Sequence, residues 1–173
     1  ILDLIPEVVE TFRVCRVWAK PAPRNVCSID IPDRFNEKVE CDLFFVYDHI
    51  ILHLLCRCTR WYAAVEVHDK KEETLIDALD RIWTKIHGAM KQLYSDGESG
   101  LVISHAAAAY FRRQAVKLCV RGKDQHAWYI ERRGALCRDQ IHRAVEQLRL
   151  EGIVKPFPQV PSEAVFAGNA LLT

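Results

Sequence analysis

The sequence predicts an α/β fold built on a mixed sheet, and two observations lead to this prediction. Three apolar runs, rich in β-branched and aromatic residues, follow one another closely between residues 39 and 67, as the strands of an antiparallel meander do. Helical periodicity then alternates with two further short apolar runs between residues 69 and 150. The element order β-β-β-α-β-α-β-α therefore predicts a layered α/β domain whose sheet has both parallel and antiparallel pairs.

The N-terminal part is expected to precede this domain. Residues 1–15 have apolar side chains at helical spacing and predict a short amphipathic helix. Residues 16–37 contain Pro21, Pro23 and Pro32 without a clear period and are interpreted as a linker. The domain itself is assigned to residues 38–152, and residues 153–173 are interpreted as a tail or as the start of a further module.

The first three strands are expected at residues 39–47, 50–58 and 61–67. Asp48 and His49 separate the first two runs and are interpreted as a tight hairpin turn. All three segments combine β-branched and aromatic residues with few breaks, which favours strands that are half or fully buried.

Helix signals punctuate the second half of the chain. Asp69 with Glu72 three residues later is a capping-box signature, and Gly88 is expected to end the helix that follows. Ser104 is expected to cap a second helix. The remaining elements are expected at residues 90–95 (strand), 104–114 (helix), 116–120 (strand) and 128–150 (helix), with a polar loop at 121–126.

Composition restricts the class of protein. A chain of 173 residues, half of them hydrophobic, can bury one full core and little more. No stretch reaches the roughly 18 uninterrupted apolar residues of a membrane helix, and no signal peptide opens the chain, so no membrane partner is expected. Seven cysteines without framework spacing favour a reducing compartment. Because the chain begins at Ile1 and ends in an apolar run, it is interpreted as a piece of a longer polypeptide.

The net charge of +1 hides an asymmetry. Between residues 112 and 149 there are ten Arg or Lys and four Asp or Glu, whereas residues 66–80 contain six acids and two lysines. A basic half on a nearly neutral chain indicates a polyanionic partner on one face, although a solvated helix surface would show the same clustering.

Asp42, Asp96 and Glu131 are the most informative residues. They lie in three separate expected elements, namely a strand centre, a strand end and a helix, and 34 residues separate the last two. Carboxylates in apolar segments are rare unless they are paired or bound to a cation. Three converging carboxylates are hard oxygen ligands suited to Mg²⁺ or Mn²⁺, and metal-assisted phosphoryl transfer needs such a site.

Each acid taken alone has a simpler explanation. Asp42 could be a solvent-facing strand residue, and Asp96 could be a turn residue because Gly97 follows it. Glu98 is then a possible substitute ligand. Glu131 could be an ordinary surface residue of a helix. The three together favour a metal site.

The element order and the placement of these acids resemble the catalytic core of retroviral and retrotransposon integrases. The resemblance covers residues 35–152, most of the chain, and the spacing of the second and third acids is close to that of family cores. The local strings that carry the resemblance are Cys41-Asp42-Leu43, Arg57-Cys58-Thr59-Arg60-Trp61, Ser95-Asp96-Gly97 and Gln125-His126-Ala127-Trp128-Tyr129-Ile130-Glu131-Arg132-Arg133.

This resemblance implies a ribonuclease H-like fold and DNA integration as the activity. It implies two Mg²⁺ or Mn²⁺ ions, with Asp42 bridging both, Asp96 holding one and Glu131 the other. The implied reaction is the trimming of a DNA 3′ end followed by attack of the freed hydroxyl on target DNA, which needs positioning and charge neutralisation but no covalent protein intermediate. The implied partners are element ends and target DNA, with self-association through the core, and the implied location is the nucleus.

Basic residues of the long helix are candidates for DNA contacts. Arg138 follows Glu131 by seven residues and therefore lies on the same helix face two turns on. Arg132 and Arg133 point about 100° and 200° away from Glu131 and could instead meet solvent or a partner. In family cores the preceding loop lies at the active site. The DNA-binding candidates are Lys123, Gln125, Arg132 and Arg138, and His126 is as easily a loop residue without a function.

Two departures from the family pattern leave alternatives open. Full-length integrases carry a zinc-binding module before the core. Residues 12–15 resemble its Cys-x-x-Cys ending with Phe12 in place of the first cysteine, so residues 1–15 are interpreted as a degenerate tail of such a module and no zinc is expected. Cys56 stands where related elements often have an acid. The alternatives are a decayed remnant that only binds DNA, and a related nuclease or transposase of the same fold.

Overall fold

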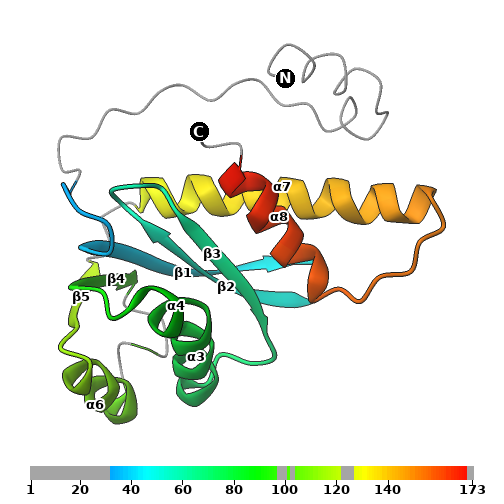
Figure 1. The fold of residues 1–173 in the computed structure, drawn as a ribbon. Coiled ribbons are helices and arrows are strands. Elements are labelled where there is room, and N and C mark those ends of the chain that lie inside the picture. Colours follow the sequence, from blue (N-terminus) through cyan, green and yellow to red (C-terminus); the bar gives the residue numbers. More distant parts are fainter. Residues whose placement is uncertain (1–31, 97–100, 102–103, 122–126, 171–173) are drawn as a thin grey trace.

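A five-stranded mixed sheet organises the molecule, with the strands in the order β3-β2-β1-β4-β5 and helices on both faces (Figure 1). The computed structural model describes residues 32–96, 101, 104–121 and 127–170. The expected helix at 1–15 and most of the expected linker at 16–37 lie outside these residues. The strands are β1 (Lys38–Val46), β2 (His49–Cys56), β3 (Tyr62–Val67), β4 (Gln92–Asp96) and β5 (Lys117–Arg121).

The strand pairing confirms the predicted mixed sheet. β1 pairs with β2 and β2 with β3 in antiparallel register, whereas β1 pairs with β4 and β4 with β5 in parallel register. The hairpin is confirmed, but its two-residue loop is Tyr47-Asp48 and not Asp48-His49, because His49 already pairs with Val46. The parallel pairs require crossovers, which the intervening helices provide.

Helices cover the two faces unequally. The helical elements are α3 (Glu72–Leu79), η1 (Asp80–Thr84), α4 (Lys85–His87), α6 (His105–Arg113), α7 (Trp128–Leu150) and α8 (Gln159–Ala170). In Figure 1, α3, α4 and α6 lie on one side of the sheet, and α7 and α8 lie on the other. We call these the α3 face and the α7 face.

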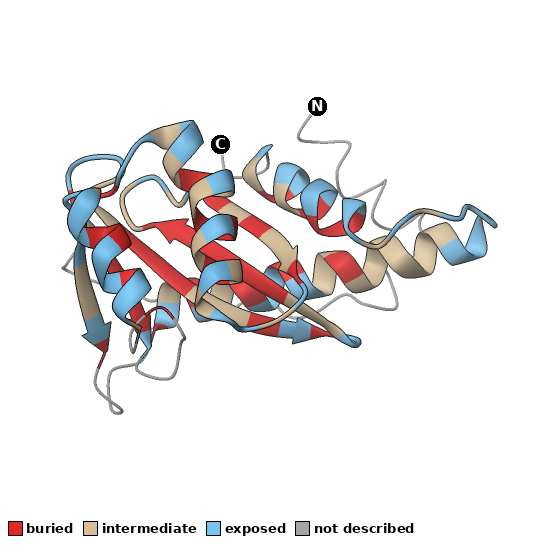
Figure 2. Ribbon diagram, turned by 90° about the horizontal axis from the view of Figure 1, so that it is seen from below, coloured by how far each residue is buried: buried red, intermediate tan, exposed pale blue. Residues whose placement is uncertain are grey.

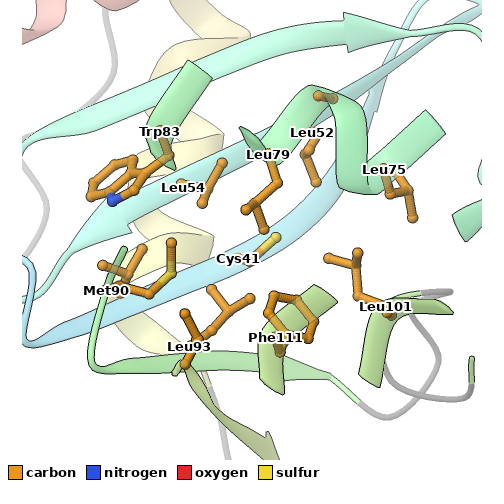
Figure 3. Packing of buried hydrophobic residues seen from close by; sticks show 14 of the residues in the cluster. Cys41, Leu52, Leu54, Leu75, Leu79, Trp83, Met90, Leu93, Leu101 and Phe111 are labelled. Carbon is orange, nitrogen blue, oxygen red and sulfur yellow. The ribbon is translucent and has the colours of Figure 1, made fainter. Parts of the chain in front are cut away.

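The α3 face is a continuous apolar core. Alternate residues of β1 and β2 point into this core and contact Leu75 and Leu79 of α3 and Trp83 of η1. Figure 3 shows these side chains closing over Cys41, with Leu93 of β4 and Phe111 of α6 on the far side. The α7 face has a second core, in which Phe44, Ile51, Leu55 and Tyr62 pack under α7 and α8. Figure 2 shows the buried residues concentrated along the central strands.

Two details of the α3 layer differ from the sequence prediction. The single helix expected up to Gly88 contains a π-helical turn, η1, where the hydroxyl of Tyr110 in α6 bonds Asp80 Oδ1 at 2.9 Å and Thr84 Oγ1 at 3.0 Å. The capping-box prediction was wrong, because the N-cap residue is Lys71 without a side-chain cap, and Asp69 instead accepts a bond from the Lys71 N–H. The predicted cap of α6 is confirmed, since the Ser104 hydroxyl accepts from the N–H groups of residues 106 and 107.

The C-terminal segment packs against the rest of the domain. Residues 159–170, expected only as a tail or the start of another module, form helix α8, which packs on β3 and α7. Val160 and Ala164 are buried there. The Asn169 side chain bonds both the N–H and the C=O of Tyr62, in the manner of a neighbouring strand. Within the described residues, no helix has the length and apolar character needed to cross a membrane.

Candidate metal and DNA site

The sheet register places Asp42 and Asp96 side by side on the α7 face. Asp42 at the middle of β1 pairs with His53 of β2. Continuing the parallel register of β1 and β4 by two residues brings Asp42 level with Asp96, which itself pairs with Arg121 of β5. Laterally aligned residues of neighbouring strands point to the same face. A single polar row, His53-Asp42-Asp96-Arg121, therefore crosses the sheet.

The pKa of Asp42 reflects both its burial and the charges around it. Partial burial raises the pKa of Asp42 to about 6, and the N–H of Leu43, 2.8 Å from Oδ1, opposes that rise. The carboxylates of Asp96 and Glu131 raise the pKa further, whereas the Arg121 guanidinium lowers it. Two additional carboxylates thus act on Asp42, one from β4 and one from α7.

Glu131 occupies the first turn of α7, as predicted, but its carboxylate is turned toward its own helix. Oε1 accepts a hydrogen bond of 3.0 Å from the N–H of Ala127, the residue that caps the helix. That N–H belongs to the group of donors that a helix start leaves without partners. Since Ala127 has no side-chain acceptor to offer, Glu131 supplies one.

The acids fit a divalent ion in their chemistry, although their side chains are not gathered around a common point. In the part of the chain that the structure describes, no three His, Cys, Asp or Glu side chains are arranged to hold a metal ion. Oxygen donors are the ligands that Mg²⁺ takes, and Asp42 experiences both other carboxylates. Like charges repel without a cation between them, and the Ala127 N–H gives Glu131 another partner.

His53 lies next to Asp42 and is neutral. Its Nε2 is 3.9 Å from Asp42 Oδ2, and its Nδ1 is 3.0 Å from the Tyr62 hydroxyl. Burial, with a smaller contribution from Arg138, lowers the pKa of His53 to about 3. Gly134 of α7 makes this packing possible, because a Cβ there would come within 2.7 Å of His53 Cε1. His53 points away from Cys56, which lies in the core of the α3 face.

The sequence analysis missed a buried ion cluster two residues before Asp42. Glu40 has no exposed surface, and its Oε1 lies 2.5 Å from Arg57 Nε and 3.0 Å from a terminal nitrogen of Arg121. Its Oε2 accepts a bond of 3.0 Å from the N–H of Ile130 in α7. The one signal in the sequence was an acid at the i−2 position of a strand acid, and therefore on the same face as Asp42.

The DNA-binding candidates have different surroundings. Arg138 is exposed, with its guanidinium carbon 5.3 Å from the centre of the Phe44 ring, on the same face as Asp42. Arg132 is half-buried. Arg133 is used within the protein, since it lies over the Tyr62 ring and donates to Asn169 at 3.4 Å. Lys123, Gln125 and His126 lie outside the described residues.

Comparison with known proteins identifies the fold. No protein-family model matches this chain, and no curated protein matches it in sequence. Two solved structures of the HTLV-2 integrase catalytic core domain in complex with magnesium, one trimeric and one dimeric, superpose on it with a TM-score of 0.65 at 10% identity. They cover 76% of this chain and 83% and 85% of their own.

Identity this low establishes the fold and not the reaction, because one fold can host many activities. The protein has the ribonuclease H-like fold of integrase catalytic cores, with a mixed five-stranded sheet flanked by helices. This confirms the fold class that the sequence predicted.

Proposed function

We propose that this protein is an integrase-type core that carries out metal-dependent DNA 3′-end processing and strand transfer. The observation that carries the proposal is the alignment of Asp42 with Asp96 on adjacent parallel strands, together with the charge of Glu131 acting on Asp42. The same fold in the magnesium complexes of HTLV-2 integrase supports it. The proposed catalytic unit is residues 38–152.

In this proposal Asp42, Asp96 and Glu131 hold two Mg²⁺ or Mn²⁺ ions. Bound ions would supply charge neutralisation at the attacking and leaving oxygens of the phosphodiester. The Leu43 N–H holds Asp42 in place for this, and the neutral imidazole of His53 lies 3.9 Å from its Oδ2. Glu131 would bind through Oε2, or through both oxygens after releasing the Ala127 N–H.

DNA would lie across the α7 face beside the acids. Arg138, exposed over Phe44, is the basic residue best placed among the described candidates to meet a phosphate. Arg132, Lys123 and Gln125 remain proposed contacts. Phosphate neutralisation releases counterions, so binding should weaken steeply as salt rises.

A second candidate is a remnant that binds DNA without catalysing its joining. The engagement of Glu131 with Ala127 and the absence of a gathered metal-ligand group among the described residues favour it. The two candidates differ in their response to ions, because only a catalytically active site should bind Mg²⁺ or Mn²⁺ through the acids.

The deciding experiment compares the parent with Asp42→Asn, in chelator and with Mg²⁺ or Mn²⁺. Ions that bind the folded state raise its melting temperature, so we expect ions to raise the melting temperature of the parent only. Strand transfer into duplex DNA should be lost in Asp42→Asn while DNA affinity is retained. An equal rise in both proteins would show that the acids form no metal site and would favour the remnant. Cleavage without joining by the parent would indicate a nuclease.

The DNA face is tested with a charge reversal on each side of the sheet. Arg138→Glu should weaken duplex binding and reduce its salt dependence, since one phosphate contact is lost. Arg81→Glu is the matched control, because Arg81 is an exposed arginine of η1 in the opposite helix layer. Equal losses in the two variants would remove the α7 face as the DNA site.

Self-association is part of the proposal, and the nucleus is the proposed location. A groove of about 410 Å³ lies beside β3, between α8 and the η1–α4 segment. Trp61, Ile86 and Phe166 line it and are 43%, 66% and 77% exposed. Exposed apolar surface of this kind is typical of interfaces, and we propose a second copy as its occupant. Phe166→Glu should lower the oligomeric state in sedimentation, whereas Val154→Glu, outside the groove, should not.

A further inference from the structure

We propose that Glu40 is the positioning residue of the metal site, a buried carboxylate that fixes the segments carrying the three acids relative to one another. This inference rests on the proposed function. Glu40 lies on β1 two residues before Asp42 and on the same face of the sheet. It touches neither substrate nor ion, and it acts through the elements that it joins.

Three segments from different parts of the chain meet at this one carboxylate. Arg57 comes from the turn after β2, with Nε 2.5 Å from Oε1. Arg121 ends β5, with a terminal nitrogen 3.0 Å from the same oxygen. The N–H of Ile130 belongs to the first turn of α7 and is 3.0 Å from Oε2. Arg121 pairs with Asp96 across β4 and β5, and Ile130 immediately precedes Glu131.

Aromatic contacts extend this cluster to the residues two before each of the other acids. The guanidinium of Arg57 lies 5.0 Å from the centre of the Tyr94 ring and 5.8 Å from that of Tyr129. Arg60 also lies over the Tyr129 ring, with its guanidinium carbon 3.6 Å from the ring centre. Tyr94 is two residues before Asp96 in β4, and Tyr129 is two residues before Glu131 in α7. The cluster therefore contacts β4 two residues before Asp96 and α7 two residues before Glu131, and so holds both segments near Asp42.

Stability alone gives no reason for a charge at this position. A carboxylate with no exposed surface loses its hydration, and an apolar side chain of similar size in place of a buried ion pair is often neutral or stabilising. The neighbours on the opposite face, Val39 and Cys41, are such apolar residues. What a carboxylate adds is direction, since it accepts from the Arg57 guanidinium and from a backbone N–H at fixed angles while it forms an ion pair with Arg121. Directional contacts of this kind set the distance between β1 and the start of α7.

The position of Glu131 depends on this distance. The first turn of α7 has no side-chain cap from Ala127, so the N–H groups of residues 127 and 130 are satisfied by the carboxylates of Glu131 and Glu40. Glu131 can give up its bond to Ala127 for an ion and leave the helix start attached, because Glu40 continues to hold it. We infer that Glu40 makes Glu131 available as a ligand.

The test uses Glu40→Gln, which keeps the size and an acceptor for Ile130 but removes the charge facing two guanidinium groups. Glu37→Gln is the matched control, because Glu37 precedes β1 and forms one partly exposed ion pair with Lys91 at 3.5 Å. In Glu40→Gln, hydrogen exchange at the amides of residues 128–131 should accelerate while exchange at β1 and β2 is unchanged. Groups that orient metal ligands affect ion affinity by roughly 10- to 100-fold, so the apparent Mg²⁺ and Mn²⁺ affinity should fall by about that factor.

A second variant separates positioning from stability. Glu40→Leu combined with Arg57→Met and Arg121→Met removes the three charges of the cluster together, so it should melt only moderately below the parent, because the Ile130 N–H alone loses its acceptor. Its response to Mn²⁺ should be reduced as in Glu40→Gln. The turnover of strand transfer should fall in both variants without a change in the half-saturating DNA concentration. Ion affinity and exchange at residues 128–131 equal to those of the parent would overturn the positioning function. Absence of any ion response in the parent, by contrast, would overturn the proposed function itself.

Discussion

The two faces of the sheet are built from different kinds of residues, although the same strands supply both. On the α3 face, β1 and β2 contribute Val39, Cys41, Leu52 and Leu54, and the buried cluster contains no charged side chain. On the α7 face the same strands contribute both apolar residues, such as Phe44 and Ile51, and polar ones, such as Asp42 and His53. Glu40, His53 and Arg121, which are three of the four buried polar or charged residues in the described chain, all lie there.

This difference assigns different tasks to the two faces. Apolar packing is non-directional and contributes roughly in proportion to the area removed from water, so the α3 face supplies most of the stability that fixes the strand order. Buried charges contribute little to stability and much to orientation. Packing on the α3 face therefore stabilises the strands, and the polar row on the α7 face can serve binding and catalysis.

The largest expected effect is on the α3 face. Leu79 of α3 has no exposed surface and packs against the sheet beside Trp83 in the core of the α3 face. Leu79→Ala should lower the free energy of unfolding by about 3–5 kcal/mol, because it removes buried methyl groups and leaves a cavity. The melting shift produced by Mg²⁺ or Mn²⁺ should be retained, since the acids lie on the other face.

Leu136 is the matched control for this truncation, because it is a leucine of α7 that is 41% exposed. Leu136→Ala should change stability by less than about 0.5 kcal/mol, as surface substitutions usually do. Chemical denaturation of the two variants measures the difference directly. A comparable loss in both would contradict the assignment of the stabilising core to the α3 face.

A smaller effect is expected where α7 meets the sheet. Alanine in place of a mid-helix glycine normally stabilises by roughly 1 kcal/mol. At Gly134, however, the new Cβ would lie 2.7 Å from Cε1 of His53, which is buried and bonded to the Tyr62 hydroxyl. We expect Gly134→Ala to lower the free energy of unfolding by about 1–2 kcal/mol, because α7 or the imidazole must move and such overpacking is destabilising.

Gly168 in α8 is the matched comparison. Its Cβ would lie 2.5 Å from a terminal nitrogen of Arg133, the far end of a flexible side chain that can swing aside. Gly168→Ala should therefore be neutral or mildly stabilising. If Gly134→Ala proved as well tolerated as Gly168→Ala, close contact between α7 and His53 would not be a constraint on the site. A double variant with His53→Ala should cost less than the sum of the single changes.

The parts of this comparison that the sequence predicted are those that depend on local pattern. Apolar runs rich in β-branched and aromatic residues located the five strands to within a few residues, and helical periodicity located α7. Ser104 was identified as a helix cap from its own side chain. The acids were placed on the correct elements for the same reason. Asp42 and Asp96 share a face because the register of the parallel pair aligns Glu40 with Tyr94, two residues before each acid.

The remaining parts depend on contacts between distant residues. The π turn at 80–84 is bonded to Tyr110 of α6, 26 to 30 residues away. The buried state of Glu40 depends on Arg121 and on the Ile130 N–H, 90 residues distant. The prolines in and before α8 hid its helical pattern in the sequence. Pro161, however, lies in the first turn of the helix, where no hydrogen bond from the proline nitrogen is needed. No window of local sequence contains such information.

An effect of similar size concerns the pH dependence of stability at Asp42, and it tests whether the Asp42 carboxyl group is buried among like charges before any ion binds. Burial, with the charges of Asp96 and Glu131, raises the pKa of Asp42 from 3.8 to about 6 in the folded state. The folded protein therefore holds a proton on Asp42 that the unfolded chain has lost between pH 4 and pH 6, so the contribution of Asp42 to stability falls as pH rises through that window.

Asp42→Asn removes this titration and should match the parent near pH 4 and exceed it above pH 6. The full shift corresponds to about 3 kcal/mol, but the Asp42 side chain is 28% exposed and solvent screens it, so we expect about 1–2 kcal/mol. His53, with its lowered pKa, titrates in both proteins and cancels in the difference. Denaturation of both proteins in chelator from pH 4 to pH 7.5 measures the difference. A constant offset across that range would mean that Asp42 keeps an ordinary pKa and that its carboxyl group is not buried as the structure places it.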